Sequence, residues 1–109
     1  MPQIDLAFEH RLGAAEAKER IVQYARRARR DPGPLVSDIQ ESWSADTGTF
    51  DIRVLAMTLH GTVKIEPARV LVQLQFPAAA LPFKAQIERE IQAKGTELLA
   101  DASGSTGPA

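Results

Sequence analysis

Apolar and polar residues alternate in several short stretches of this chain, and two longer stretches repeat apolar residues at helical spacing. The first stretch, IDLAFEHRL from Ile4, has a period of two and predicts a strand. After Gly13 the apolar residues recur every three or four positions as far as Arg30, which predicts a helix. The DPGP segment at residues 31–34 ends this helix, because proline has no amide hydrogen and disfavours a helical residue before it.

Four more alternating stretches follow, joined by links short enough for antiparallel hairpins. They are LVSDIQESWSA from Leu35, FDIRVLAM from Phe50, LHGTVKI from Leu59 and RVLVQLQF from Arg69. A turn at Pro67 and Ala68 predicts that Ile65 pairs with Val70. The apolar residues that recur with a period of two then lie on one face of the sheet, as a half-buried sheet requires.

The middle hairpin is predicted to turn near Thr58, which sets Ala56 opposite Gly61 and Arg53 opposite Lys64. In this register a mixed outer face carries apolar residues among polar ones, and it either mediates self-association as a homodimer or is simply solvated. The candidate partner-binding residues on this face are Arg53, Leu55, Met57, His60 and Leu71.

Pro82 predicts the start of a final helix of about 19 residues, ~28 Å long, since proline is tolerated at the first helical position. Its apolar stripe is Phe83, Ile87, Ile91 and Leu98. Gly95 lies inside this helix, and we favour close packing against the sheet as the reason. Residues 1–101 then form a single α+β domain, and residues 102–109, small and polar, form a disordered tail.

The predicted fold is α+β, in the order β-α-β-β-β-β-α. Each helix and the sheet have one apolar face, so two layers bury them all, with both helices on the same face of a five-stranded, mostly antiparallel sheet. We place the first strand beside the fifth, which gives the order 1-5-4-3-2 and a reduced helix-grip-like architecture.

Composition excludes several kinds of chemistry. The chain of 109 residues contains no cysteine, so it has no disulfide, thiol nucleophile or zinc-thiolate site. The two histidines lack partners at metal-ligand spacing, and no motif of a nucleotide, serine-hydrolase or zinc-protease site is present. We expect no catalytic residues, metal or cofactor, and therefore no enzyme. The net charge of −1 argues against a nucleic-acid partner, because nucleic-acid-binding domains usually carry an excess of basic residues.

The first helix ends in an arginine-rich turn. Together with Lys18 and Arg20, these basic residues spread over about 200° around the helix, which is too wide for a stripe that follows a phosphate backbone. Cations in the last turn also interact favourably with the helix dipole. We favour a solvated helix end, with an anionic partner as the alternative. The four residues are Arg26, Arg27, Arg29 and Arg30.

Glu41 falls on the apolar face between Ile39 and Trp43. An inward-pointing charge on an edge strand blocks edge-to-edge pairing, and we favour this interpretation. The alternative is a pocket that contains Glu41 and Trp43. However, we expect apolar side chains to fill the space between the C-terminal helix and the sheet and to leave little room for a ligand. These side chains are Trp43, Phe50, Phe76, Phe83 and Ile87.

The segments HRLGAAEAKERI, SWSADTGTFDIR, MTLHGTVKIEPARVLVQLQF and PFKAQIEREIQAKGTELLA resemble the polyhydroxyalkanoic acid system family. These are small bacterial proteins named for their association with polyester storage gene clusters, and the similarity covers about residues 4 to 100. The resemblance implies a cytoplasmic location and an accessory role near polyester granules. It brings no active-site residues.

Three functions follow as alternatives. The first is a non-enzymatic accessory protein of polyester storage that binds a partner protein or the granule surface. The second is a module that binds an acyl or lipid-like ligand between the C-terminal helix and the sheet; a pocket of several hundred cubic ångströms there would favour it. The third is nucleic-acid binding through the first helix, with an affinity that falls steeply with salt. No run of apolar residues is long enough to span a membrane.

Overall fold

The computed structural model describes residues 2–31 and 36–100, so the predicted tail and most of the DPGP segment lie outside the described residues. The elements occur in the predicted order, with one additional 3₁₀ helix before the last helix. They are β1 (Gln3–Glu9), α1 (Ala14–Arg30), β2 (Val36–Ser44), β3 (Thr47–Val54), β4 (Met57–Ile65), β5 (Arg69–Gln75), η1 (Ala78–Phe83) and α2 (Lys84–Leu98).

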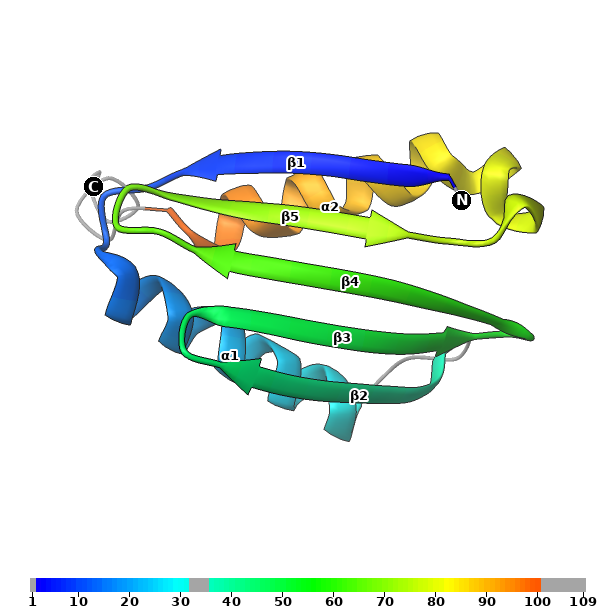
Figure 1. Ribbon diagram of the computed structural model, residues 1–109, viewed down its shortest axis with the longest axis horizontal. Helices are drawn as coiled ribbons and strands as arrows, with labels where there is room; N and C mark the ends of the chain where they lie inside the picture. The colour runs from blue at the N-terminus through cyan, green and yellow to red at the C-terminus, as the bar shows by residue number, and fades with distance from the viewer. Residues whose placement is uncertain (1, 32–35, 101–109) are drawn as a thin grey trace.

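The five strands form one sheet in the order β1-β5-β4-β3-β2, and every neighbouring pair is antiparallel. Both helices lie behind this sheet in Figure 1, on the same face. Helix α2 packs along β1, whereas α1 packs against β2 and β4. The predicted α+β architecture and strand order are therefore confirmed.

The registers confirm one hairpin prediction and correct the other. Ile65 pairs with Val70 across the turn at Pro67 and Ala68, as predicted. The middle hairpin instead turns at Leu55 and Ala56, so Val54 pairs with Met57. The prediction that Ala56 pairs with Gly61 was wrong.

Leu55 makes this tighter turn possible by adopting a φ of 56°, in the left-handed region that hairpin turns use. Neither turn residue is glycine or asparagine, so the sequence lacks the usual signal for a two-residue turn. The shift has two consequences. Arg53 pairs with Thr58 rather than with Lys64. Met57 moves to the inner face, where it packs against the core.

Helix α1 has the predicted bounds. It follows Gly13, whose φ of 81° lies in the region that favours glycine. It ends at Arg30 and is capped by Asp31, whose backbone N–H donates to the carbonyl of Arg27. Ala17 and Ala25 are its buried residues, and both present a small side chain to the sheet.

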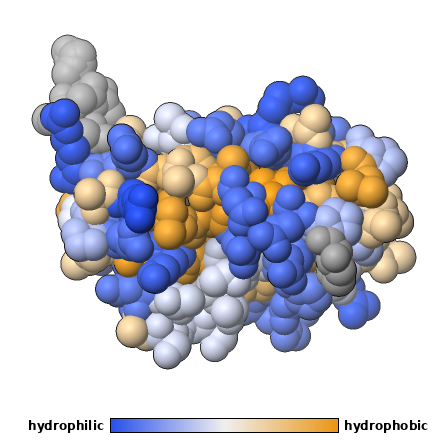
Figure 2. Space-filling view, turned by 45° about the horizontal axis from the view of Figure 1, so that its top comes forward, coloured by the Kyte–Doolittle hydropathy of each residue, from blue (hydrophilic) through white to orange (hydrophobic). Residues whose placement is uncertain are grey.

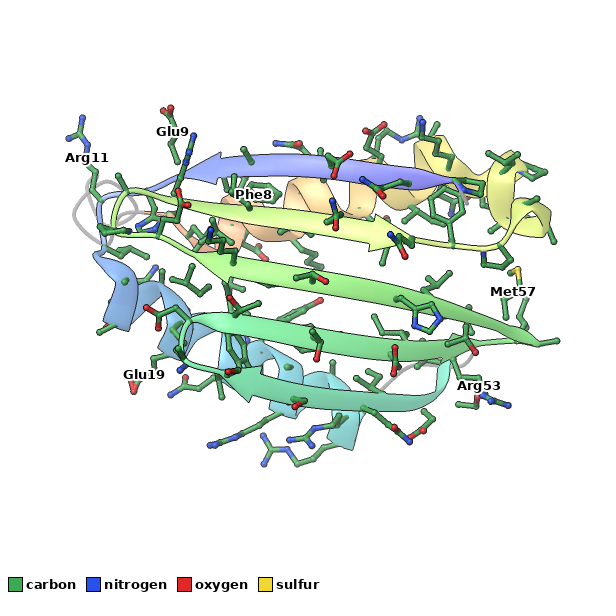
Figure 3. All side chains as sticks on the ribbon, in the orientation of Figure 1. Phe8, Glu9, Arg11, Glu19, Arg53 and Met57 are labelled. Atoms are coloured by element: carbon green, nitrogen blue, oxygen red, sulfur yellow. The ribbon has the colours of Figure 1, made fainter. Side chains whose placement is uncertain are left out.

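Helix α2 begins later than predicted, because Pro82 lies inside the 3₁₀ helix η1 rather than at the start of the α-helix. Phe83 is 51% exposed, so it does not belong to the apolar stripe. Gly95 confirms close packing: a Cβ at this position would lie 2.5 Å from the ring of Phe8, which projects from β1 (Figure 3).

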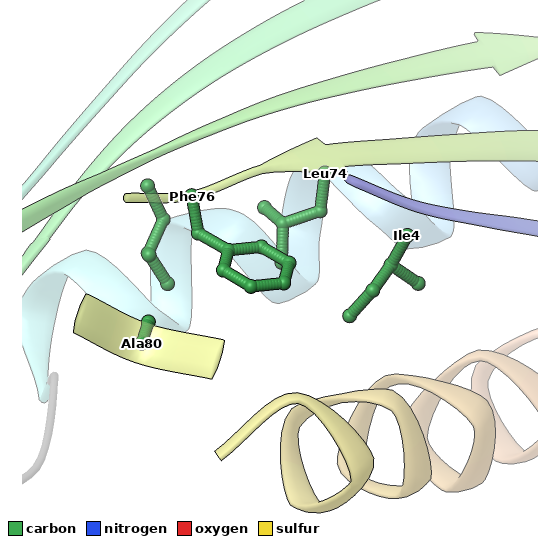
Figure 4. Packing of buried hydrophobic residues seen from close by; sticks show 5 residues of the cluster. Ile4, Leu74, Phe76 and Ala80 are labelled. Atoms are coloured by element: carbon green, nitrogen blue, oxygen red, sulfur yellow. The ribbon is translucent and has the colours of Figure 1, made fainter. Parts of the chain in front are cut away.

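The core forms two clusters. The first surrounds Phe76, which is fully buried between η1 and the sheet (Figure 4); its members are Ile4, Leu59, Leu74, Phe76 and Ala80. The second joins the start of α1 to the end of α2; its members are Phe8, Ala17, Ile65, Val70 and Leu99. Apolar residues on the central strands, such as Ile52, Val63 and Val72, are only half-buried. The two helices therefore leave part of the inner face of the sheet uncovered.

Candidate functional site

An apolar groove of about 370 Å³ lies on the inner face of the sheet between the two helices. We call it the interhelical groove. Its floor comes mainly from β3, β4 and β5, with Phe8 of β1 and Ile39 of β2 also in the lining, and its walls come from one side of each helix. The main floor residues are Phe50, Ile52, Gly61, Val63, Val72 and Leu74. Its volume falls in the range of roughly 300–1,000 Å³ that is typical of small-molecule sites.

The helix residues that line the groove are of two kinds, aliphatic and polar. On α1 the wall is formed by Ile21, Ala25 and Ala28, whose side chains are small or aliphatic. Ile91 and Leu98 form the wall on α2. The polar lining residues are on the two helices: Tyr24 on α1, with Glu90 and Lys94 on α2. An apolar chain in the groove would therefore find only apolar contacts on the sheet, with charges confined to the helices.

Gly61 keeps the floor of the groove open. It lies in the middle of β4 with an uninterrupted register on both sides, opposite Phe50 on β3 and Leu74 on β5. No bulge or turn requires a glycine here. A Cβ built at Gly61 would meet Leu74 at 3.5 Å, which is an ordinary contact. The missing side chain therefore creates space rather than avoiding a clash.

The expectation that aromatic side chains fill this space was wrong. Trp43 lies at one end of the sheet over Gly48, where a Cβ would come within 2.8 Å of the indole. Phe76 is buried under η1, and Phe83 is exposed. Only Phe50, of the aromatic residues expected there, lines the groove.

Glu41 and Trp43 form a hydrogen-bonded pair outside the groove. The Glu41 side chain is only 7% exposed, and its Oε2 accepts a 2.6 Å hydrogen bond from Nε1 of Trp43. Its Oε1 lies 3.5 Å from Nη2 of Arg29 on α1. The candidate ligand-pocket residues Glu41 and Trp43 thus join the edge strand to α1, and neither lines the interhelical groove.

A protein-family model described as "Putative polyhydroxyalkanoic acid system protein" matches residues 4–99. The chain belongs to this family. The match spans the whole of the described fold from β1 to α2, so the groove lies within the matched region. No curated protein and no solved structure matches the chain.

The four arginines of this polyhydroxyalkanoic acid system protein line one depression at the end of α1 together with Gln23, but they differ in their contacts. Arg29 pairs with Glu41, as described above. The guanidinium of Arg27 lies 5.8 Å from the ring centre of Tyr24, at the edge of the groove. Among the described residues, Arg26 and Arg30 have no carboxylate within 4.0 Å. The solvated-end interpretation therefore does not extend to Arg29, which ties α1 to the sheet.

The predicted outer-face residues are dispersed. Leu55 is 61% exposed at the turn, and Met57 lies on the inner face. His60 pairs with Asp51 at 2.6 Å, and both side chains are exposed. Leu71 is half-buried in a cross-strand row between Ala7 and Lys64. Arg53 lies near the end of β3, and Figure 3 shows it at the far end of the sheet from Glu9 and Arg11.

Apolar surface also reaches the β1 side of this family member. Figure 2, which brings this side forward, shows apolar side chains grouped in its middle, with hydrophilic side chains around them. A shallow depression on the outer face there is lined by Ala7 and Leu71, with Asp5, Lys64 and Gln73. Ala7 and Leu71 are neighbours across β1 and β5, but charged and amide side chains share the lining with them, so the depression is less uniform than the interhelical groove.

His10 has a structural role that the sequence did not reveal. It is 8% exposed, and its Nδ1 accepts a 3.1 Å hydrogen bond from the backbone N–H of Leu12. Its Nε2 lies 3.1 Å from the carbonyl of Glu66 and donates to it in the matching tautomer. The backbone N–H of His10 also donates to the carbonyl of Ala68. His10 thus fixes the end of β1 to the β4–β5 turn.

The part of the chain that the structure describes lacks two features that would point to other functions. No group of three or more His, Asp or Glu side chains is arranged to hold a metal ion. No helix in this part is both long and apolar enough to cross a membrane.

Proposed function

We propose that this protein is an accessory protein of the polyhydroxyalkanoate storage system that binds hydroxyacyl chains in the interhelical groove. The groove is the observation that supports the proposal, because it offers about 370 Å³ of apolar space where side chains were expected to fill the interior. The family description supplies the chemistry of the ligand, since polyhydroxyalkanoic acid is a polyester of aliphatic hydroxy acids. This favours the ligand-binding alternative over the binding of a partner protein.

The lining fits such a chain. Burial of an aliphatic chain against apolar walls contributes about 0.8 kcal/mol for each methylene removed from water. The floor has no charged side chain, so a neutral hydrocarbon tail would displace only water. We propose binding rather than catalysis because the charged residues lie on the helices, away from the floor.

The test is isothermal titration with 3-hydroxydecanoate, below its micelle concentration, to wild type and two matched variants. Gly61→Val places two methyl groups in the floor of the groove, and a Cβ is sterically accepted there. Thr62→Val changes the next residue of β4, which faces the outer side of the sheet, opposite Thr49 and Gln73.

We expect wild type and Thr62→Val to bind equally, and Gly61→Val to bind at least tenfold more weakly. Thermal unfolding of all three proteins controls for loss of fold. Absence of binding to wild type, or equal binding to Gly61→Val, would refute the proposal.

Granule attachment is a second candidate that uses the same site. The groove is open to solvent, so it is also accessible to the ends of polyester chains at a granule surface. Co-sedimentation of purified protein with granules tests this: wild type and Thr62→Val should sediment with granules, and Gly61→Val should remain in the supernatant. If all three sediment alike, attachment uses another surface, and the arginines of α1 become the next residues to substitute.

A further inference from the structure

The two helices that border the interhelical groove form a V. Figure 1 shows them closest together where α1 begins and α2 ends. Arg20 closes this end, because its Nη1 donates to the carbonyls of Leu98 at 3.2 Å and Ala100 at 2.7 Å. The helices diverge toward the C-terminal end of α1 (Figure 1), where the arginines lie. The groove therefore has a closed end and an open end.

A cationic cleft adjoins the open end of the groove. It is lined by Tyr24, Arg27, Ala28, Arg30 and Asp31. Tyr24 and Ala28 also line the interhelical groove, so the two depressions share a border. The guanidinium of Arg27 lies over the Tyr24 ring at this border. On α1, the surface thus changes from the aliphatic wall of the groove to arginine side chains within about one turn.

The cations around this border are available to a ligand. Arg27, Arg30 and Lys94 face the groove or the cleft, and Asp31 and Glu90 are the carboxylates that share the same lining. Within residues 2–31 and 36–100, none of these three cations lies within 4.0 Å of a carboxylate. Arg29 differs because it pairs with Glu41. Arginine side chains bind carboxylate and phosphate oxygens well, because their donors form a planar fork.

We propose that the ligand of the groove is an amphiphile whose anionic head group is held by Arg27 and Arg30, with its aliphatic tail toward the closed end. This inference rests on the proposed function and adds the polarity and orientation of the ligand. The shared chemistry of the head is an oxyanion, either the carboxylate of a free hydroxy acid or the phosphates of a coenzyme A thioester.

The experiment compares three ligands that carry the same tail: 3-hydroxydecanoate, its neutral methyl ester and 3-hydroxydecanoyl-coenzyme A. Each is titrated into wild type and into the variants Arg27→Gln, Arg30→Gln and Arg26→Gln. Arg26 is the matched control, because it lies on the same helix but lines neither the groove nor the cleft. Circular dichroism verifies that every variant retains its fold.

We expect the acid to bind wild type about tenfold more tightly than the ester, which corresponds to ~1.4 kcal/mol. Arg27→Gln and Arg30→Gln should reduce or remove this difference, whereas Arg26→Gln should preserve it. Affinity for the acid should also fall with added salt. If the thioester binds more tightly than the acid, and its affinity falls more in Arg27→Gln and Arg30→Gln, the phosphates are the head group. If the thioester binds more weakly than the acid, the head group is the carboxylate.

Two results would overturn the inference. Equal binding of acid and ester would show that no anionic head is recognised, while the proposed function would stand. An acid preference that survives both Arg27→Gln and Arg30→Gln would place the anion elsewhere in the protein. If none of the three ligands binds wild type, the proposed function fails, and this inference fails with it.

Discussion

The indole of Trp43 donates a 2.6 Å hydrogen bond to the carboxylate of Glu41, two residues earlier on the same face of β2. The second oxygen of that carboxylate faces Arg29 on α1. A charged group on the inner face of an edge strand is costly unless it is paired. Here the indole and the guanidinium satisfy it, and in doing so they tie α1 to the edge of the sheet.

Replacement of Glu41 is expected to destabilise the fold. Glu41→Ala leaves the Trp43 N–H and the Arg29 guanidinium without their acceptor, which costs about 1–3 kcal/mol in the free energy of unfolding. Glu41→Gln should cost less, because the amide oxygen still accepts from Trp43. Urea unfolding followed by tryptophan fluorescence measures both. Ser42→Ala, on the exposed face of the same strand, is the control, and an equal effect of Ser42→Ala and Glu41→Ala would contradict this interpretation.

Substitution of glycine by alanine is expected to have opposite effects on stability at Gly95 and at Gly61. Gly95→Ala forces a Cβ to within 2.5 Å of the Phe8 ring, and such overpacking costs typically 1–3 kcal/mol. This should outweigh the gain of about 1 kcal/mol in helix propensity. Gly61→Ala meets only ordinary contacts, so it should be neutral or stabilising by about 0.4–1 kcal/mol. Thermal unfolding of both variants decides the point; a stabilised Gly95→Ala would show that α2 can move away from β1.

Loss of the His10 side chain is expected to loosen the β4–β5 turn. His10→Ala leaves the Leu12 N–H and the Glu66 carbonyl without their imidazole partner, at a cost of about 1–3 kcal/mol. Arg11→Ala is the control, since Arg11 is exposed and points away from the molecule (Figure 3), and its effect should stay within about 0.5 kcal/mol. Hydrogen exchange of the Leu12 amide provides a local readout, because it should become faster in His10→Ala only.

The Glu66–Arg69 pair predicts a pH dependence of stability. Arg69 Nε donates a 2.6 Å hydrogen bond to Glu66, and this bond lowers the pKa of the Glu66 carboxyl below its ordinary value of 4.5. A folded-state pKa below the unfolded one means that the pair stabilises the fold above pH 4.5. That stabilisation is lost as the pH falls through the lowered pKa. The effect should be small, because surface pairs are screened by solvent and salt.

The measurement is urea unfolding at a series of pH values from neutral to below 4.5. Glu66→Gln should show a weaker decline of stability over the acidic part of this range than wild type. Glu19→Gln, an exposed glutamate outside any ion pair among the described residues, should follow the wild-type curve. Parallel curves for wild type and Glu66→Gln would show that the pair does not contribute to folding.

The sequence by itself determined the order of the elements, the antiparallel sheet and the face on which most residues lie. These depend on local patterns: a period of two keeps Phe50 and Ile52 on one face, and short links leave only hairpin connections. The turn at Pro67 and Ala68 was predicted correctly because proline marks it in the sequence.

Only the tertiary structure decided the rest. The register of the middle hairpin depends on the left-handed backbone of Leu55, which no residue type at that turn signals. Gly61 was visible as a lone glycine on an apolar face, but the interhelical groove above it depends on the angle between α1 and α2. That angle is set by long-range contacts, such as the bonds from Arg20 to the end of α2 and the packing of Phe8 against Gly95. Local periodicity fixes which face of each element is apolar, whereas the space between two apolar faces is fixed only when all the elements pack together.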